Sequence, residues 1–128
     1  MDDSQRSTSS PSPEPEIMGA RCPVRRVLRV IGDKWTPVVL YCLAGGVLRF
    51  GDFQRRIPDI SRKMLTQVLR ELEAAGLVER TAYPVSPPRT EYRLTDTGRR
   101  LHEPTAMLCR WAHENMALLE EIEAARNA

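Results

Sequence analysis

Three observations on the sequence predict a mainly α-helical domain with a small β-hairpin, in the α+β class. Apolar residues recur at helical spacing over most of the chain between residues 24 and 122. Two segments, 77–83 and 89–94, have the pattern of paired strands and flank a proline-rich loop. The chain has 128 residues, of which 41% are hydrophobic, and this suits one small soluble domain.

The N-terminal segment differs in composition from the rest. Residues 1–20 contain five Ser and three Pro, with almost nothing apolar before Ile17. They cannot offset the entropy of ordering, so we expect a disordered tail over 1–20 and a folded domain over 21–128. The tail lacks the basic and apolar regions of a secretory signal, and no apolar run approaches the roughly 20 residues of a membrane span. We therefore expect a cytoplasmic protein with no membrane partner.

Two helices are predicted to open the domain. Pro23 suits the first turn of a helix that Gly32 ends. A second helix is expected to begin near Thr36, with Asp33 or Thr36 itself as N-cap, and to end before Gly45. Because its residues are apolar on all sides, we expect it to be the buried central helix.

The next segment has the outline of a helix-turn-helix. A short helix is expected from Gly51, a turn at 58–60, and a long helix from Ser61, a good N-cap, to Gly76. Apolar residues occupy one face of the long helix, and polar residues occupy the opposite face.

The segment after the long helix predicts a wing. The loop 84–88 contains three prolines in five residues, so a tight two-residue turn between the strands is excluded. The strands 77–83 and 89–94 should therefore end in a stiff, projecting tip.

The final helix is expected to begin after Thr95 as N-cap, and Pro104 should kink or restart it. Its apolar stripe continues to Ile122, farther than the winged body can cover. Such a stripe indicates a surface for a partner, most simply a second copy of the chain.

The basic residues gather in one block, although the net charge is only +2. Residues 21–63 carry ten basic and three acidic side chains, a balance of +7, whereas 1–20 and 101–128 each carry −3. Such clustering favours a surface that faces a polyanion, the alternative being an ordinary solvated face.

The long helix offers the side chains that a reader of the DNA major groove needs near its N-terminus. Ser61 and Arg70 suit contacts with phosphate, and Arg62 or Lys63 suits guanine or phosphate. Gln67 suits adenine, and Thr66 offers a hydroxyl and a methyl. Arg89 beside the wing tip suits phosphate or the minor groove. The predicted DNA-binding residues are thus Ser61, Arg62, Lys63, Thr66, Gln67, Arg70 and Arg89.

The cysteines are too few and too widely spaced for a disulfide framework or a CxxC motif. Cys22 precedes the first helix among arginines, a setting that lowers a thiol pKa and favours a redox or electrophile sensor. The alternative is a small side chain packed at an interface. His102, Cys109 and His113 share a helical stripe, but no fourth protein ligand is evident, so no metal is expected.

No enzymatic chemistry is predicted. The sequence lacks a Gly-rich phosphate loop, HExxH, GxSxG and paired carboxylates in an apolar setting. We therefore expect neither catalytic residues nor a cofactor.

Several motifs together carry a resemblance to a known family. They are Cys22-Pro23-Val24, Gly32-Asp33-Lys34-Trp35-Thr36, Arg49-Phe50-Gly51-Asp52-Phe53, Ile60-Ser61-Arg62-Lys63-Met64-Leu65, the run from Leu69 to Arg80, Pro87-Pro88-Arg89-Thr90-Glu91-Tyr92 and Leu94-Thr95-Asp96-Thr97-Gly98. With these motifs, residues 22–116 resemble the HxlR-type family of bacterial winged helix-turn-helix transcription regulators.

The resemblance implies homodimers that bind pseudo-palindromic DNA and dimerise through the first and last helices. The corresponding interface residues here are Val24, Leu28, Leu108, Trp111, Met116 and Leu119. In some members a cysteine at the position of Cys22 is a thiol switch for oxidants or electrophiles.

The residues and the resemblance together predict a dimeric, sequence-specific DNA-binding regulator associated with the nucleoid in the cytoplasm. That it acts as a repressor is implied by the resemblance alone. Its signal is expected to act through Cys22 or through a small ligand at the dimer interface. The alternatives are a ligand-responsive regulator without a thiol switch, and a winged-helix module that binds protein. The latter needs an apolar or acidic face on 61–76, and that face is basic.

Overall fold

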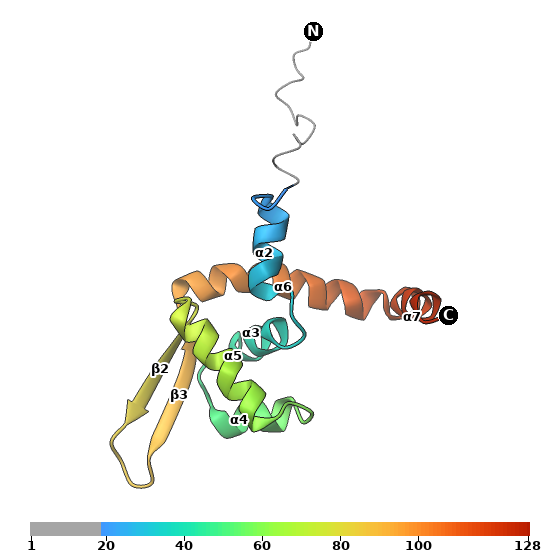
Figure 1. Cartoon of the computed structure of the whole chain (residues 1–128). Helices are drawn as coiled ribbons and strands as arrows, with labels where there is room; N and C mark the ends of the chain where they lie inside the picture. The colour runs from blue at the N-terminus through green and yellow to red at the C-terminus, as the bar shows by residue number, and fades with distance from the viewer. Residues whose placement is uncertain (1–18) are drawn as a thin grey trace. The chain divides into compact units, whose positions relative to one another are not determined.

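The computed structural model describes residues 19–128 (Figure 1). The predicted disordered tail lies outside the described residues except for its last two positions. Of the described residues, 19–33 belong to one compact unit, and Lys34–Ala128 form a second.

The first unit contains helix α2, Pro23–Ile31. Pro23 occupies the first turn, and the Gly32 N–H closes the helix with a 2.8 Å hydrogen bond to the Leu28 carbonyl, as predicted. Arg29 donates through Nη2 to the carbonyl of Ala20, at 2.8 Å, which ties the segment before the helix to its last turn.

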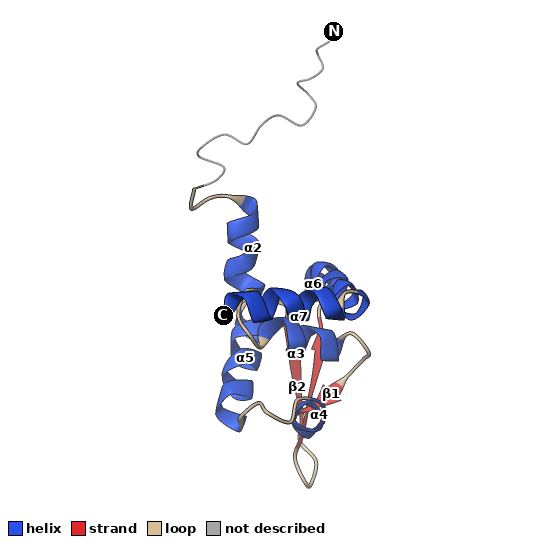
Figure 2. Cartoon of the chain, turned by 90° about the vertical axis from the view of Figure 1, so that its right-hand side faces the viewer, coloured by secondary structure: helices blue, strands red, loops and turns tan. Residues whose placement is uncertain are grey.

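The second unit has the predicted mainly helical architecture with a small antiparallel sheet (Figure 2). Its elements are α3 (Thr36–Leu43), β1 (Leu48–Arg49), α4 (Phe50–Arg56), α5 (Arg62–Ala74), β2 (Val78–Tyr83), β3 (Arg89–Leu94), α6 (Asp96–Glu114) and α7 (Met116–Arg126). The α+β class and the winged helix-turn-helix are thereby confirmed, with α4 and α5 as the helix pair and β2 and β3 as the wing.

The sheet has the strand order β1-β3-β2. In the wing, Val78 lies opposite Leu94 and Tyr83 lies opposite Arg89, so the two strands pair along their full length. β1 adds Leu48 opposite Tyr92 on the other edge of β3. The wing tip projects beyond α4 in both views (Figures 1 and 2).

The core of this unit lies between the helices and the sheet. The apolar face of α5 is buried, including Leu65 and Leu69, and Phe53 of α4 is fully buried. Phe53 meets Tyr92 of β3 edge to face, with ring centroids 6.0 Å apart. The polar face of α5 is therefore directed outward by a packed apolar face.

The predictions for the second helix need correction. The N-cap of α3 is Trp35, without a side-chain cap, and neither Asp33 nor Thr36 has that position. The helix is also not buried on all sides, because Val38 and Tyr41 are exposed. A sequence that is apolar all round does not distinguish the face that packs on the core from the face that is left open.

The final helix is interrupted at a different residue from the one predicted. α6 continues through Pro104, and the break lies at Asn115. The Asn115 side chain donates through Nδ2 to the Trp111 carbonyl, at 2.9 Å. The backbone N–H of Asn115 donates to the Ala112 carbonyl. A side-chain donor thus occupies the carbonyl that the next turn would use.

Beyond the break, α7 takes a new direction. Each of α6 and α7 is seen along its length in the view where the other is seen end on (Figures 1 and 2). The predicted apolar stripe therefore lies on two helices. No helix within residues 19–128 is long and apolar enough to cross a membrane.

Candidate nucleic-acid interface

The interface begins at the N-terminus of α5. Ser61 is the N-cap, as predicted, in an extended conformation, and its Oγ accepts a 3.0 Å hydrogen bond from the Met64 N–H. Ser61 is exposed, so its hydroxyl can be reached from solvent. The N-terminus of α5 therefore keeps donors directed to solvent.

The polar side chains of α5 form one continuous surface. Together they line a shallow hollow of about 480 Å³. The residues that line it are Arg62, Lys63, Thr66, Gln67, Arg70 and Glu71. Five of the seven residues predicted to bind DNA therefore lie side by side, with Ser61 directly before them.

Two of these side chains already have partners. The guanidinium carbon of Arg62 lies 4.8 Å from the ring centre of Phe50, so the ring supports the charge. Gln67 donates through Nε2 to Glu71 Oε2, at 3.2 Å.

The seventh predicted residue, Arg89, lies at the start of β3. Its guanidinium carbon is 4.6 Å from the ring centre of Tyr83, its cross-strand partner. Its Nε is 3.5 Å from Glu91 Oε2. Glu91 also lies 3.5 Å from Arg93 Nη2, so one carboxylate is shared by two arginines of the wing.

Sequence reasoning left out Arg80 of β2. Arg80, Thr66 and Arg70 line a second hollow of about 380 Å³ beside Tyr92. Strand parity was the available signal, because Arg80 has the same parity as buried Val78 and therefore lies on the sheet face that meets α5. Arg80 extends the basic surface from α5 onto the wing.

The helix before the turn is capped by a carboxylate. Asp52 Oδ2 accepts a 2.8 Å hydrogen bond from the Arg49 N–H, and Asp52 also pairs with Arg55. The hydrogen bond from the Arg49 N–H is the main cause that holds the pKa of Asp52 below its usual value. Burial opposes it, and the charges of Arg55 and Arg56 add to the lowering.

Comparison with known proteins then settles the family. The model of the HxlR-like helix-turn-helix family matches residues 30–120. This chain belongs to the HxlR-like helix-turn-helix family. The matched range includes α3 to α6 and all of the wing.

Relatives of the chain are transcription regulators. It is 40% identical to the HTH-type transcriptional regulator YtfH of Escherichia coli over 124 residues, 97% of this chain and 96% of YtfH. It is also 40% identical to the HTH-type transcriptional regulator YdeP of Bacillus subtilis over 107 residues, 84% of each chain. The structure of the redox regulator HypR in its reduced form is similar, with a TM-score of 0.74 and 42% identity over 77% of this chain and 98% of HypR.

The family and its fold identify the chain as a transcription regulator of the winged-helix HxlR type. Regulators of this type are not enzymes. The predicted family and the predicted class of function are therefore confirmed at this level.

Cys22 of this HxlR-type chain lies at the N-cap position of α2 and is buried. Its N–H donates to the Gly19 carbonyl at 3.0 Å, and its own carbonyl accepts from the Arg26 N–H at 2.9 Å. Cys42 is half-buried, and burial raises the pKa of its thiol. All three cysteines are free thiols.

The histidines and Cys109 on α6 have partners within their own helix. Cys109 Sγ lies 3.9 Å from His113 Nδ1, whereas His102 Nδ1 lies 3.2 Å from Thr105 Oγ1. A hydrogen bond with Cys109 is the main cause that raises the pKa of Tyr41. Within the described residues these side chains form no group of three that could hold a metal ion.

The side chains predicted for a dimer interface are mostly open. On α2, Val24 and Leu28 are exposed, and on α6 and α7 the same holds for Leu108, Trp111 and Met116. Leu119 alone of the six is half-buried. Each helix therefore presents apolar surface that this single chain does not cover.

Proposed function

We propose that this HxlR-type regulator binds duplex DNA sequence-specifically as a homodimer and represses transcription, in the cytoplasm on the nucleoid. The observation that carries the proposal is the α5 surface. Its polar side chains form one hollowed, outward face from Ser61 to Arg70, held in place by the buried apolar face behind it. An α-helix of this kind fits the major groove of B-DNA.

The side chains divide into two kinds of contact. Three kinds of side chain suit base edges. Gln67 has a donor and an acceptor, Arg62 or Lys63 has donors, and Thr66 adds a methyl and a hydroxyl. Ser61 with the helix N-terminus, Arg70 and Arg80 suit phosphates. Arg89 places a cation at the base of the wing tip, where it suits phosphate or the minor groove.

The homodimer is supported by the uncovered apolar side chains on α2, α6 and α7. Two copies related by a two-fold axis would present two α5 helices to half-sites about one helical turn apart. Sedimentation of the wild type and of Leu108→Glu tests this step. The proposal expects a dimer for the wild type and a monomer for the variant, whereas a wild-type monomer at micromolar concentration contradicts it.

The experiment that tests DNA recognition is selection of the reduced full chain against a random duplex library at near-physiological salt. The proposal expects enrichment of an inverted repeat. Salt-dependent binding with no enriched sequence would indicate a non-specific polyanion surface and would contradict it. Repression is then tested with a reporter that carries the enriched repeat between promoter and gene.

A second proposal concerns the signal, which we infer to be oxidation or alkylation of Cys22. The similarity to HypR, a redox regulator, supports it, as does the place of Cys22 at the start of α2 beside Arg21 and Arg25. Because the thiol is buried, a reagent reaches it only when the start of α2 opens locally. A bulky adduct would then keep that segment open.

A further inference from the structure

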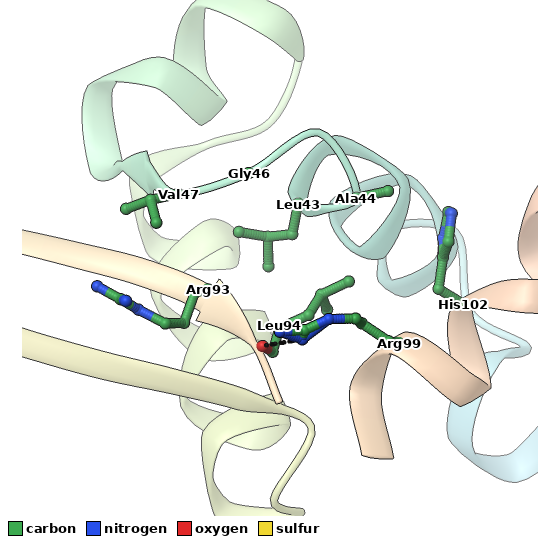
Figure 3. A pocket seen from close by; sticks show the side chains of 8 residues that line it. All are labelled: Leu43, Ala44, Gly46, Val47, Arg93, Leu94, Arg99 and His102. Atoms are coloured by element: carbon green, nitrogen blue, oxygen red, sulfur yellow. Dashed lines mark hydrogen bonds between the residues drawn. The ribbon is translucent and has the colours of Figure 1, made fainter. Parts of the chain in front are cut away.

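A cavity of about 520 Å³ lies in the second unit, away from the α5 surface. It lies between the end of α3 with the following loop, the end of β3, and the first turns of α6 (Figure 3). Its volume is within the range of about 300–1,000 Å³ that is typical of small-molecule sites. None of the residues predicted to bind DNA lines it.

The lining combines apolar walls with two cations. Leu43, Ala44, Val47 and Leu94 provide the apolar part, whereas Arg93 and Arg99 provide the charge. In Figure 3, Arg93 and Val47 lie at one end, His102 lies at the other, and Arg99 extends from α6 toward Leu94. No carboxylate is among the residues that line this cavity.

Both arginines retain unused hydrogen-bonding capacity. Arg99 Nη1 donates to the Leu94 carbonyl at 3.3 Å and lies 3.7 Å from the fully exposed Asp96. Arg93 is 3.9 Å from Glu79 and 3.5 Å from Glu91, and its buried Nε has no hydrogen-bond acceptor in the described chain. These are long pairs, and a guanidinium has five N–H donors.

We propose that this cavity binds a small organic carboxylate with an apolar body. The carboxylate pairs with Arg99 and Arg93, and the apolar body lies against Leu43 and Val47. A compact inorganic anion would leave the apolar walls uncovered, and a neutral apolar compound would leave the arginines unpaired, so the lining favours a molecule with both parts.

The cavity is also connected to the wing, and this part of the inference rests on the proposed DNA binding. Arg93 shares Glu91 with Arg89. A ligand carboxylate that draws Arg93 away leaves Glu91 to pair with Arg89 alone. Glu91 then holds Arg89 back from the DNA phosphate. The ligand is therefore expected to weaken DNA binding.

The site is tested by NMR titration of the ¹⁵N-labelled full chain with phenylacetate, and with acetate and benzyl alcohol as probes of the charge and of the ring alone. The expected result is saturable shifts at the amides of Gly46, Val47 and Leu94, with phenylacetate binding more tightly than either probe. Saturable shifts confined to other residues, or equal binding of benzyl alcohol, would overturn the proposal.

Variants make the test specific. Arg99→Gln should weaken phenylacetate binding roughly tenfold, because a charge-assisted hydrogen bond is lost. Arg100→Gln is the matched control, since Arg100 is exposed on the same turn but does not line the cavity, and its effect should stay below about twofold. Glu79→Gln removes a competitor for Arg93 and should tighten binding. An unchanged dissociation constant in Arg99→Gln would refute the site.

The link to the wing has its own measurement, the anisotropy of a labelled DNA duplex that carries the selected repeat. Phenylacetate should weaken DNA binding by the wild type and have no effect on Arg99→Gln. Phenylacetate that occupies the cavity without changing DNA affinity would refute the link. If the chain bound no DNA, the proposed function would fail, but the NMR titration would still decide the site.

Discussion

Gly98 in the first turn of α6 lies directly against the carbonyl oxygen of Leu77. A Cβ at position 98 would lie only 2.0 Å from that oxygen. Thr95 holds the two segments together, because its Oγ1 donates to the Gly76 carbonyl at 2.7 Å and accepts from the Gly98 N–H at 3.0 Å. The start of α6 is thereby fixed to the connection between α5 and the wing.

Gly98→Ala should destabilise the fold, because the blocking atom belongs to the backbone and cannot move without shifting α6. Overpacking of this kind costs about 1–3 kcal/mol. Urea unfolding monitored by circular dichroism measures the change. Gly45→Ala is the control, since a Cβ there meets nothing within 4 Å. Equal stability of the Gly98→Ala chain and the wild type would show that the helix start is not held as closely as described.

The α5 surface predicts two different losses for two neighbouring polar residues. Lys63→Ala should weaken binding to all duplexes and lower the salt slope by about one, because one phosphate contact is lost. Gln67→Ala should relax specificity at one position, at a cost of about 1–3 kcal/mol for the preferred base. Fluorescence titrations over a salt series with the selected repeat and its single-base variants measure both. Unchanged affinity of both variants at every salt concentration would contradict the docking of α5.

The carboxylate of Glu91 is predicted to restrain the wing. It pairs with Arg89 and Arg93, whereas Glu79 approaches Arg93 alone. Glu91→Gln should therefore raise DNA affinity, about twofold to fivefold at low salt, by releasing Arg89 and removing a negative charge. Glu79→Gln removes the same charge without touching the Arg89 pair, so its gain should be smaller. Equal gains for the two variants would mean that only net charge matters.

Asp52 links stability to pH. Its pKa is lowered in the folded chain, first by the hydrogen bond from the Arg49 N–H, so its contribution is fully present above the unfolded pKa of about 3.9 and is lost as pH falls through the lower folded pKa. Asp52→Asn should cost about 1 kcal/mol at neutral pH, as for other helix caps.

The difference between Asp52→Asn and the wild type should shrink as the pH falls below about 4. Thermal unfolding between pH 2 and 7 measures it. Asp59→Asn, an exposed residue of the following turn, removes the same charge and should change stability little. A difference that is constant with pH would show that the charge of Asp52 plays no part in the cap.

Local chemistry explains which elements were predictable from the sequence. Ser61 and Thr95 are N-caps because a short hydroxyl side chain can accept from an N–H three residues on, and this requires no knowledge of the tertiary fold. The outward face of α5 followed from helical spacing alone. The three prolines of the loop 84–88 likewise made the wing recognisable.

The features that sequence reasoning missed depend on which surfaces meet. Strand alternation places Arg80 on one face of the sheet. Only the packing of β2 against α5 shows that this face borders the polar side chains of α5. Which face of α3 is exposed, the one with Tyr41, depends on which neighbouring elements cover the rest of the helix. Helix α6 continues through Pro104, where only the proline's own N–H donor is missing. It ends at Asn115, whose side chain donates to the Trp111 carbonyl that the next helical turn would use.

The thiol proposal predicts a loss of response when Cys22 is replaced. Cys22→Ser keeps the size of the side chain at the start of α2, so DNA binding by the reduced chain should change little. Hydrogen peroxide, which converts a thiol to a sulfenic acid and is itself reduced to water, should release DNA from the wild type but not from Cys22→Ser, because the serine hydroxyl is not oxidised under these conditions. Cys42→Ser and Cys109→Ser are the matched controls and should respond like the wild type, since each removes one thiol elsewhere in the chain. Release of DNA by the oxidised Cys22→Ser chain would assign the response to another residue, and the two control variants would then show which thiol carries it.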